Sequence, residues 1–225
     1  MTPFSTLATA RTPEGGELSL HKREPHFYLR LDRQPLMATN APESERVLAQ
    51  QACQRILDRP APRVLIGGLG FGFTLAQVLE LVGKKAHVHV AELVPEVVAW
   101  NREFLGDVNG RLLDDPRVTI SIADVYAIMG EAGSTPYDAI LLDVDNGPVA
   151  MVQKSNARLY QSRGFATIQK ALKSTGRVVF WSANRDEAFA ERLTKAGFKV
   201  EVVAAKAYAQ AKRNSHTIFV ADRGV

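Results

Sequence analysis

Short apolar runs alternate with amphipathic stretches from residue 63 to the last residues of the chain. Several runs, such as Val64-Leu65-Ile66, are apolar at consecutive positions, which is typical of strands buried on both faces of a sheet. The stretches between them have helical spacing, so the alternation predicts a mostly parallel, doubly wound α/β sheet. The predicted strands are 63–67, 87–91, 118–122, 138–142, 177–182, 198–203 and 216–221, and the predicted helices are 73–82, 95–104, 125–130, 156–173 and 186–196.

The last two predicted strands, 198–203 and 216–221, have no helix-length segment between them. Parallel neighbours need a long crossover connection that is usually helical, whereas antiparallel neighbours do not. We therefore expect a seven-stranded sheet that is mostly parallel and ends in an antiparallel C-terminal hairpin at its edge.

The N-terminal part of the chain follows a different pattern. Apolar and polar residues alternate between Glu17 and Met37, which predicts a small antiparallel β-meander of about three short strands. The residues before it show no periodicity and are expected to form a flexible arm. A helix is predicted from Pro42 to Leu57, because apolar residues recur there at helical spacing before two prolines. The expected organisation is an arm (1–15), a β-meander (16–40) and a Rossmann-like domain (41–225).

Composition narrows the class of protein. The 225 residues are 46% hydrophobic, and no apolar run reaches the ~20 residues that a membrane span needs. With no leader-like N-terminus, we expect a cytoplasmic protein without a membrane partner. The single cysteine, Cys53, excludes an internal disulfide and a cysteine-rich zinc site. His87 and His89 lack a third ligand, so no metal is expected. The net charge of +4 is scattered along the chain, which favours ordinary surface charge over nucleic-acid binding.

A glycine-rich turn between a predicted strand and a predicted helix is the main candidate binding element. Glycines allow the backbone to approach a ligand closely, and the N–H groups at the helix start face a polar or anionic group. Glu92 ends the next strand, about 20 residues further on, where a carboxylate can accept both hydrogen bonds of a ribose diol. The combination predicts a nucleoside site. The glycines are Gly67, Gly68, Gly70 and Gly72.

Acidic residues follow three successive predicted strands. Ligands of an open α/β sheet bind beyond the carboxyl ends of its strands, and these ends carry Glu92, Asp124 and Asp143 without a cluster of bases. Such a rim disfavours a diphosphate and favours a cationic nucleoside with a ribose diol and an amine. The pattern therefore indicates a sulfonium donor.

Four segments resemble the spermidine synthase family of class I S-adenosylmethionine-dependent transferases: residues 64–79, Glu92, the Ala-Asp step at Asp124, and the run from Tyr137 to Asp143. The resemblance covers about residues 17–221 and implies the class I methyltransferase fold, with S-adenosylmethionine or its decarboxylated form as co-substrate. It implies that Glu92 holds the ribose, that the adenine amine lies near Asp124, and that Asp143 faces the reacting centre. The donor residues so implied are Gly67, Gly68, Gly70, Gly72, Glu92, Leu93, Asp124 and Val125.

Transfer to an amine requires an unprotonated nucleophile held in line with the carbon beside the sulfonium, so one carboxylate must take a proton. Asp143 is the candidate base, although it also fits a turn cap through the N–H groups of Asn146 and Gly147. Asp145 is a second catalytic candidate. Asp124 fits an N-cap of the following helix, a role that is compatible with adenine contact. The candidate substrate-binding residues are Asn146, Tyr160 and Trp181, each with a competing structural role.

Three departures from the family keep other functions open. Phe71 stands where spermidine synthases carry the loop acid that holds the donor's amine, residues 143–148 read Asp-Val-Asp-Asn-Gly-Pro, and Ser44 begins the segment that replaces a Tyr-His pair. We expect a transferase that passes an aminopropyl or methyl group to a small amine acceptor. The alternatives are a methyltransferase acting on another small molecule, a protein or RNA, and a non-catalytic nucleoside-binding protein. The β-meander is an expected homodimer surface.

Overall fold

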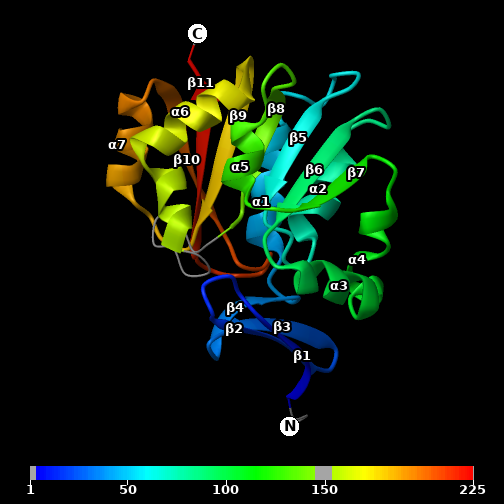
Figure 1. Cartoon of the computed structure of the whole chain (residues 1–225). Helices are drawn as coiled ribbons and strands as arrows, with labels where there is room; N and C mark the ends of the chain where they lie inside the picture. The colour runs from blue at the N-terminus through cyan, green and yellow to red at the C-terminus, as the bar shows by residue number, and fades with distance from the viewer. Residues whose placement is uncertain (1–3, 145–153, 225) are drawn as a thin grey trace.

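The structure, a computed structural model, describes residues 4–144 and 154–224. Figure 1 shows a large sheet flanked by helices, with a smaller sheet below one end of it. Within the described residues the large sheet has seven strands in the order β10-β11-β9-β8-β5-β6-β7. These strands are β5 (Arg63–Gly67), β6 (His87–Glu92), β7 (Val118–Ile122), β8 (Tyr137–Leu142), β9 (Leu172–Ser182), β10 (Phe198–Ala205) and β11 (His216–Arg223).

The strand order confirms the predicted fold class. Strands β7, β6, β5, β8 and β9 run parallel, whereas β11 pairs antiparallel with both β9 and β10. The chain enters the sheet at β5, extends it to one side through β6 and β7, and then returns to β8 on the other side. The carboxyl ends of β5 and β8 therefore flank the point where strand order reverses, which is where such sheets bind ligands.

Helices cover both faces of the large sheet (Figure 1). Alternate residues of each strand point to opposite faces: in β8, Ala139 and Leu141 pack with α1, α2 and α3, whereas Ile140 and Leu142 pack with α5, α6 and α7. Burial on both faces explains why the strands are apolar at consecutive positions. The helices are α1 (Glu43–Cys53), α2 (Phe73–Leu81), α3 (Pro95–Glu103), α4 (Gly106–Asn109), α5 (Val125–Gly130), α6 (Ser162–Ala171) and α7 (Glu187–Lys195), with 3-10 turns η1 (Leu112–Asp114) and η2 (Lys154–Tyr160). None of these helices, taken over the described ranges, is long and apolar enough to cross a membrane.

The smaller sheet corrects the prediction of a flexible arm at residues 1–15. Residues 5–11 form a strand, β1, that pairs antiparallel with β2. The strand escaped prediction because it lies at a sheet edge, where it is held by main-chain hydrogen bonds and buries few side chains. Only Leu7, Ala8 and Ala10 pack against the core. The order β1-β2-β3-β4 comprises β1 (Ser5–Arg11), β2 (Glu17–Arg23), β3 (His26–Leu31) and β4 (Gln34–Ala38).

The helix predicted over 156–173 is divided. A 3-10 turn ends at Tyr160, Gln161 is extended, and α6 begins at Ser162. Leu172 is also extended (φ −90°, ψ 144°) and begins β9 directly after α6. The apolar spacing continues across both boundaries, so it carried no signal for either break.

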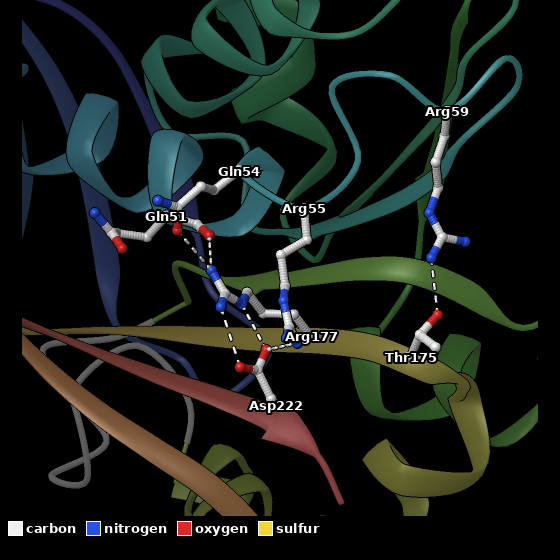
Figure 2. Close-up of polar contacts among 7 residues, drawn as sticks. All are labelled: Gln51, Gln54, Arg55, Arg59, Thr175, Arg177 and Asp222. Atoms are coloured by element: carbon white, nitrogen blue, oxygen red, sulfur yellow. Dashed lines mark hydrogen bonds and ion pairs between the residues drawn. The ribbon is translucent and has the colours of Figure 1, made fainter. Parts of the chain in front are cut away.

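A part-buried ion pair between Arg177 of β9 and Asp222 of β11 ties the last strand to α1, away from the cleft described below. Figure 2 shows the Arg177 guanidinium donating to both oxygens of Asp222, from Nε at 2.7 Å and from Nη2 at 3.1 Å. Its Nη1 donates to the carbonyl oxygen of Gln51 at 2.7 Å, and Arg55 contacts Asp222 from the solvent side at 3.0 Å. Burial acts to raise the pKa of Asp222, but the hydrogen bonds and charges of the two arginines outweigh it and lower that pKa.

Arg177→Met is expected to lower the free energy of unfolding by about 3 kcal/mol, because it leaves a part-buried carboxylate without its main partner. Urea denaturation at pH 7 measures the change. Arg55→Met is the matched control: the Arg55 side chain is 50% exposed, so its loss should cost under about 1 kcal/mol. Equal losses in the two variants would contradict the dominant role assigned to Arg177.

Candidate functional site

A cleft lies between the carboxyl ends of β5, β6 and β8 and the smaller sheet. The large sheet and the loops after its strands supply the polar wall, and the smaller sheet supplies an apolar wall. This is the position expected for a ligand of a doubly wound sheet. The described residues that line it are Leu18, Leu29, Leu36, Met37, Glu45, Gly68, Gly70, Ala91, Glu92, Leu93, Val94, Val97, Ala123, Asp124, Val125, Asp143, Val144, Asn156 and Trp181.

The glycine turn brings two strand ends into contact. Gly68 has φ +88°, and its N–H donates to the carbonyl oxygen of Ala91 at 2.9 Å. A Cβ at Gly68 would lie 2.2 Å from the carbonyl oxygen of Asp143. Glycine is thus required both for the backbone conformation and for the close approach of the segment after β8. The turn consequently fixes where Asp143 enters the cleft.

Gly68→Ala is expected to lower the free energy of unfolding by about 2–5 kcal/mol, from the strain of a positive φ and the overlap with backbone. Thermal or urea unfolding measures the loss. Gly83→Ala provides the control, because a Cβ at Gly83 meets nothing within 4 Å and the residue does not have a positive φ. If both alanine variants were equally stable, the close approach at Gly68 would not constrain the chain.

Two asparagines hold the carbonyl groups of the glycine turn. Asn101 Nδ2 donates to the carbonyl oxygen of Gly70 at 2.8 Å, and Asn109 Nδ2 donates to that of Phe71 at 3.0 Å. Asn109 also donates to Asn101 Oδ1 at 2.7 Å, so the two side chains act together. On the cleft side, Met37 of the smaller sheet faces Gly70, where a Cβ would lie 2.9 Å from the thioether. The absence of a side chain at Gly70 therefore makes room for the opposite wall of the cleft.

Glu92 is fixed by backbone N–H groups on both oxygens. Oε2 accepts from Leu69 at 2.8 Å and Oε1 from Val94 at 2.9 Å. The residue is 7% exposed, and burial raises the pKa of its carboxyl against the opposing effect of these N–H groups. The N–H groups of Leu93 and Gly70 also act to lower this pKa, so four backbone donors surround the carboxyl group, which lines the cleft. The predicted contact of Glu92 with a ribose diol stays a prediction.

Asp124 has two protein partners. Oδ1 accepts from the N–H of Tyr126 at 2.8 Å and caps α5, as the competing interpretation had it. Oδ2 accepts from the Arg158 guanidinium, which lies 4.3 Å from the centre of the Tyr126 ring. Asp124 and Val125 also line the cleft, so capping does not remove them from the predicted adenine position. Arg158 lies 34 residues further along the chain, and its contact with Asp124 was not predicted.

Asp143 follows β8, is half-buried, and shares the cleft with a buried acid, Glu45. Thr74 Oγ1 donates to Asp143 Oδ2 at 2.9 Å. Burial raises the pKa of Asp143 to about 6 even though this hydrogen bond acts to lower it. Glu45 lies in α1, and its pKa is raised to about 7, chiefly by burial and secondly by the charge of Asp143. The cleft therefore contains a carboxyl group that changes protonation near neutral pH, as a general base requires.

The remaining predicted site residues differ in their placement. Trp181 lines the cleft, and its ring centre is 4.9 Å from that of His216. Tyr160 is 3% exposed and packs against Phe180 and Phe189 in the core below α6 and α7, at 5.9 and 5.4 Å between ring centres. Tyr160 is not among the described lining residues, so its predicted substrate contact is corrected to core packing. Leu93 lines the cleft, whereas Gly67 and Gly72 belong to the glycine turn and are not among the described lining residues.

Asp145 and Asn146 lie outside the described residues, as does the Gly147 N–H group of the alternative turn-cap interpretation of Asp143. The predicted roles of Asp145 in catalysis and of Asn146 in substrate binding stay predictions. Within the two described ranges, no three or more His, Cys, Asp or Glu side chains gather as a metal site. His89 contacts the Tyr137 hydroxyl at 3.0 Å and the Ser121 hydroxyl at 2.8 Å.

Glu45 is the main site residue that sequence reasoning missed. A signal was present: Glu45, Leu48, Ala49 and Ala52 recur at helical spacing and are all buried, so an acid occupies the apolar face of α1. Charged residues are almost never fully buried without a partner. An acid on that face was therefore a candidate for chemistry.

Comparison with known proteins supports the resemblance drawn from the sequence. No protein-family model matches the chain. The chain is 33% identical over 128 residues to a polyamine aminopropyltransferase of Pyrobaculum calidifontis, a match that covers 56% of the chain and 43% of the relative. It is 32% identical over 118 residues to putrescine N-methyltransferase 2 of Nicotiana attenuata, covering 52% of the chain and 30% of the relative. The chain thus covers less than half the length of these curated relatives, all of which are transferases by name.

A solved structure extends the likeness to nearly the whole chain. The spermidine synthase of Thermotoga maritima superposes with a TM-score of 0.75 over 98% of this chain and 73% of that one. At 18% identity, this structural similarity shows a shared fold and does not show a shared activity. The chain is thus similar in sequence to the named transferases and in fold to a spermidine synthase.

Proposed function

We propose that this chain is a transferase that binds S-adenosylmethionine or its decarboxylated form and passes an alkyl group to a small amine. One observation carries the proposal: Glu92 and Asp143 face one cleft from either side of the glycine turn. Glu92 places a carboxyl group on the cleft wall, where its oxygens can accept from a ribose diol, and Asp143 has a pKa of about 6, suited to accepting an amine proton.

The donor fits the residues that are present. Gly70 leaves room beside Met37, Glu92 offers hydrogen-bond acceptors in place, and the described lining residues include four acids without a lysine or arginine. An acidic cleft favours a cationic ligand. When bound, the donor supplies a carbon atom activated by an adjacent sulfonium. The chain's own residues hold the nucleoside, orient the amine and take its proton.

The proposal covers both aminopropyl transfer and methyl transfer, and Phe71 favours methyl transfer. Phe71 is 1% exposed and packs edge-on against Phe73, at 6.3 Å between ring centres. It thus offers no charge where the spermidine synthase family carries the acid for the donor's amine. The named similarity to putrescine N-methyltransferases supports methyl transfer to an amine as the second candidate function.

Calorimetric titration with S-adenosylmethionine, its decarboxylated form and methylthioadenosine tests the donor class. We expect binding of at least one of the three, and binding of none would overturn the proposal. Incubation of each donor with primary diamines then separates the reactions, because aminopropyl transfer releases methylthioadenosine and methyl transfer releases S-adenosylhomocysteine. The homodimer and the cytoplasmic location remain predictions from the sequence.

A further inference from the structure

Glu45 lies in the proposed active cleft but has no part in the roles assigned above. It belongs to the first turn of α1, is 6% exposed, and lines the cleft together with Asp143. Each of the two acids accepts a hydrogen bond from a neighbouring hydroxyl: Ser44 Oγ donates to Glu45 Oε2 at 2.5 Å, and Thr74 Oγ1 donates to Asp143 Oδ2 at 2.9 Å. The two carboxyl groups are therefore held on separate elements and face a common space.

The surroundings of this pair provide little positive charge. The smaller sheet contributes only Leu18, Leu29, Leu36 and Met37 to the cleft lining. Arg46, on the same helix as Glu45, acts weakly to lower the pKa of Glu45, and its side chain is 51% exposed. The charge of Asp143 acts in the opposite direction.

The other charged groups of the described cleft are already engaged. Glu92 accepts two backbone N–H groups, and Asp124 accepts from Tyr126 and Arg158. On the β9 side, the described lining residue is Trp181, and the His216 ring beside it has a pKa lowered by burial. Two like charges in one cleft oppose each other's ionisation, so the charge of Asp143 favours a protonated Glu45.

We infer that Glu45 is a positioning residue that shares a single proton with Asp143, so that the pair presents one negative charge to the ammonium group of the acceptor. The inference rests on the proposed function and extends it. It assigns the acceptor end of the cleft to a single ammonium group and gives Asp143 a partner that controls when it is ionised.

Proton and charge balance follow from this arrangement. The acceptor's ammonium gives one proton to the singly charged pair, which becomes neutral. The amine nitrogen then bonds to the carbon beside the sulfonium, the carbon–sulfur bond breaks, and its electrons stay on sulfur as a neutral thioether. The product amine carries the remaining positive charge. The proton on the pair leaves to solvent after product release, which restores the starting state.

Carbon-13 NMR titration of side-chain carboxyl groups tests the shared proton without donor or acceptor. In Glu45→Gln, Asp143 should titrate at a pH lower by about one unit or more than in the unaltered protein, since strongly interacting groups are coupled by at least that much. Glu43→Gln removes the same formal charge two residues away, from a side chain 28% exposed that contacts Arg46, and should leave the Asp143 titration in place. An unchanged Asp143 titration in Glu45→Gln overturns the inference.

A reciprocal variant guards against a folding failure of Glu45→Gln. Asp143→Asn should lower the pH at which Glu45 titrates by a similar amount, and no shift there would equally overturn the inference. Activity then links the pair to the acceptor: the acid limb of kcat/KM for the amine should move to lower pH in Glu45→Gln, whereas a purely structural defect would lower kcat/KM at every pH. Coincident pH profiles refute the role of Glu45 but leave the proposed function standing. If the unaltered protein turns over no amine, the proposed function fails, and the ammonium role of the pair fails with it.

Discussion

Glu92→Gln is expected to weaken binding of methylthioadenosine by about 100-fold or more. Hydrogen bonds to a charged group contribute about 1.5–3 kcal/mol each, and the substitution removes one acceptor oxygen together with the charge on the other, a loss near the roughly 2.8 kcal/mol that equals 100-fold. Glutamine retains one oxygen and turns an NH₂ group toward a backbone N–H. Isothermal titration calorimetry measures the affinity.

Thermal unfolding of the same variant separates binding from stability, because the misplaced NH₂ group also leaves a buried N–H unsatisfied. Glu103→Gln is the control, since Glu103 ends α3 and is exposed. It should bind as the unaltered protein does. Donor affinity within a few-fold of normal in a folded Glu92→Gln protein would refute the ribose role.

Asp143→Asn is expected to reduce turnover by about 10²–10⁴-fold, the usual contribution of a positioned base, while donor affinity changes only a few-fold. Steady-state kinetics with the amine identified as substrate, together with calorimetry, measures both quantities. Asp114→Asn removes an acid whose side chain is 54% exposed in an ion pair with Arg111, and it should not change either. Normal turnover in Asp143→Asn would refute the role of Asp143 as the base.

Asp143→Asn is also expected to change how the free energy of unfolding depends on pH. Burial raises the pKa of Asp143 from 3.8 to about 6, so the folded state binds more protons than the unfolded state between those values. The free energy of unfolding therefore falls as pH rises through this window, and the loss is complete above pH 6. Asp143→Asn should lack this share of the pH dependence. Urea denaturation at pH 4 and pH 8 compares the two proteins.

The large sheet was predictable because its strands are buried on both faces, which makes them continuous apolar runs in the sequence. Its C-terminal hairpin followed from the connection between the last two strands, which is too short for a crossover helix. The edge strand β1 was not predictable in this way, because it buries only small side chains and one leucine. The change from α6 to β9 at Leu172 was equally hidden, since a buried leucine suits either element.

The residues of the candidate site were likewise predictable only in part. Glu92, Asp124 and Asp143 were predictable because each follows a parallel strand, and all such ends meet at one edge of the sheet. Glu45 and Arg158 reach the same place from helical segments that adjoin it only in the folded chain. Tyr160 was misplaced because an aromatic residue at helical spacing fits a pocket wall and a core equally well.

The smaller sheet and the large sheet share one hydrophobic core. Leu20 and Leu31 of the smaller sheet belong to the same buried cluster as Leu48 of α1 and Val78 of α2. The cleft wall therefore cannot be exchanged independently: grafting another N-terminal sheet onto this chain would require repacking of α1 and α2 as well. Evolutionary change in this wall of the cleft is tied to change in the protein interior.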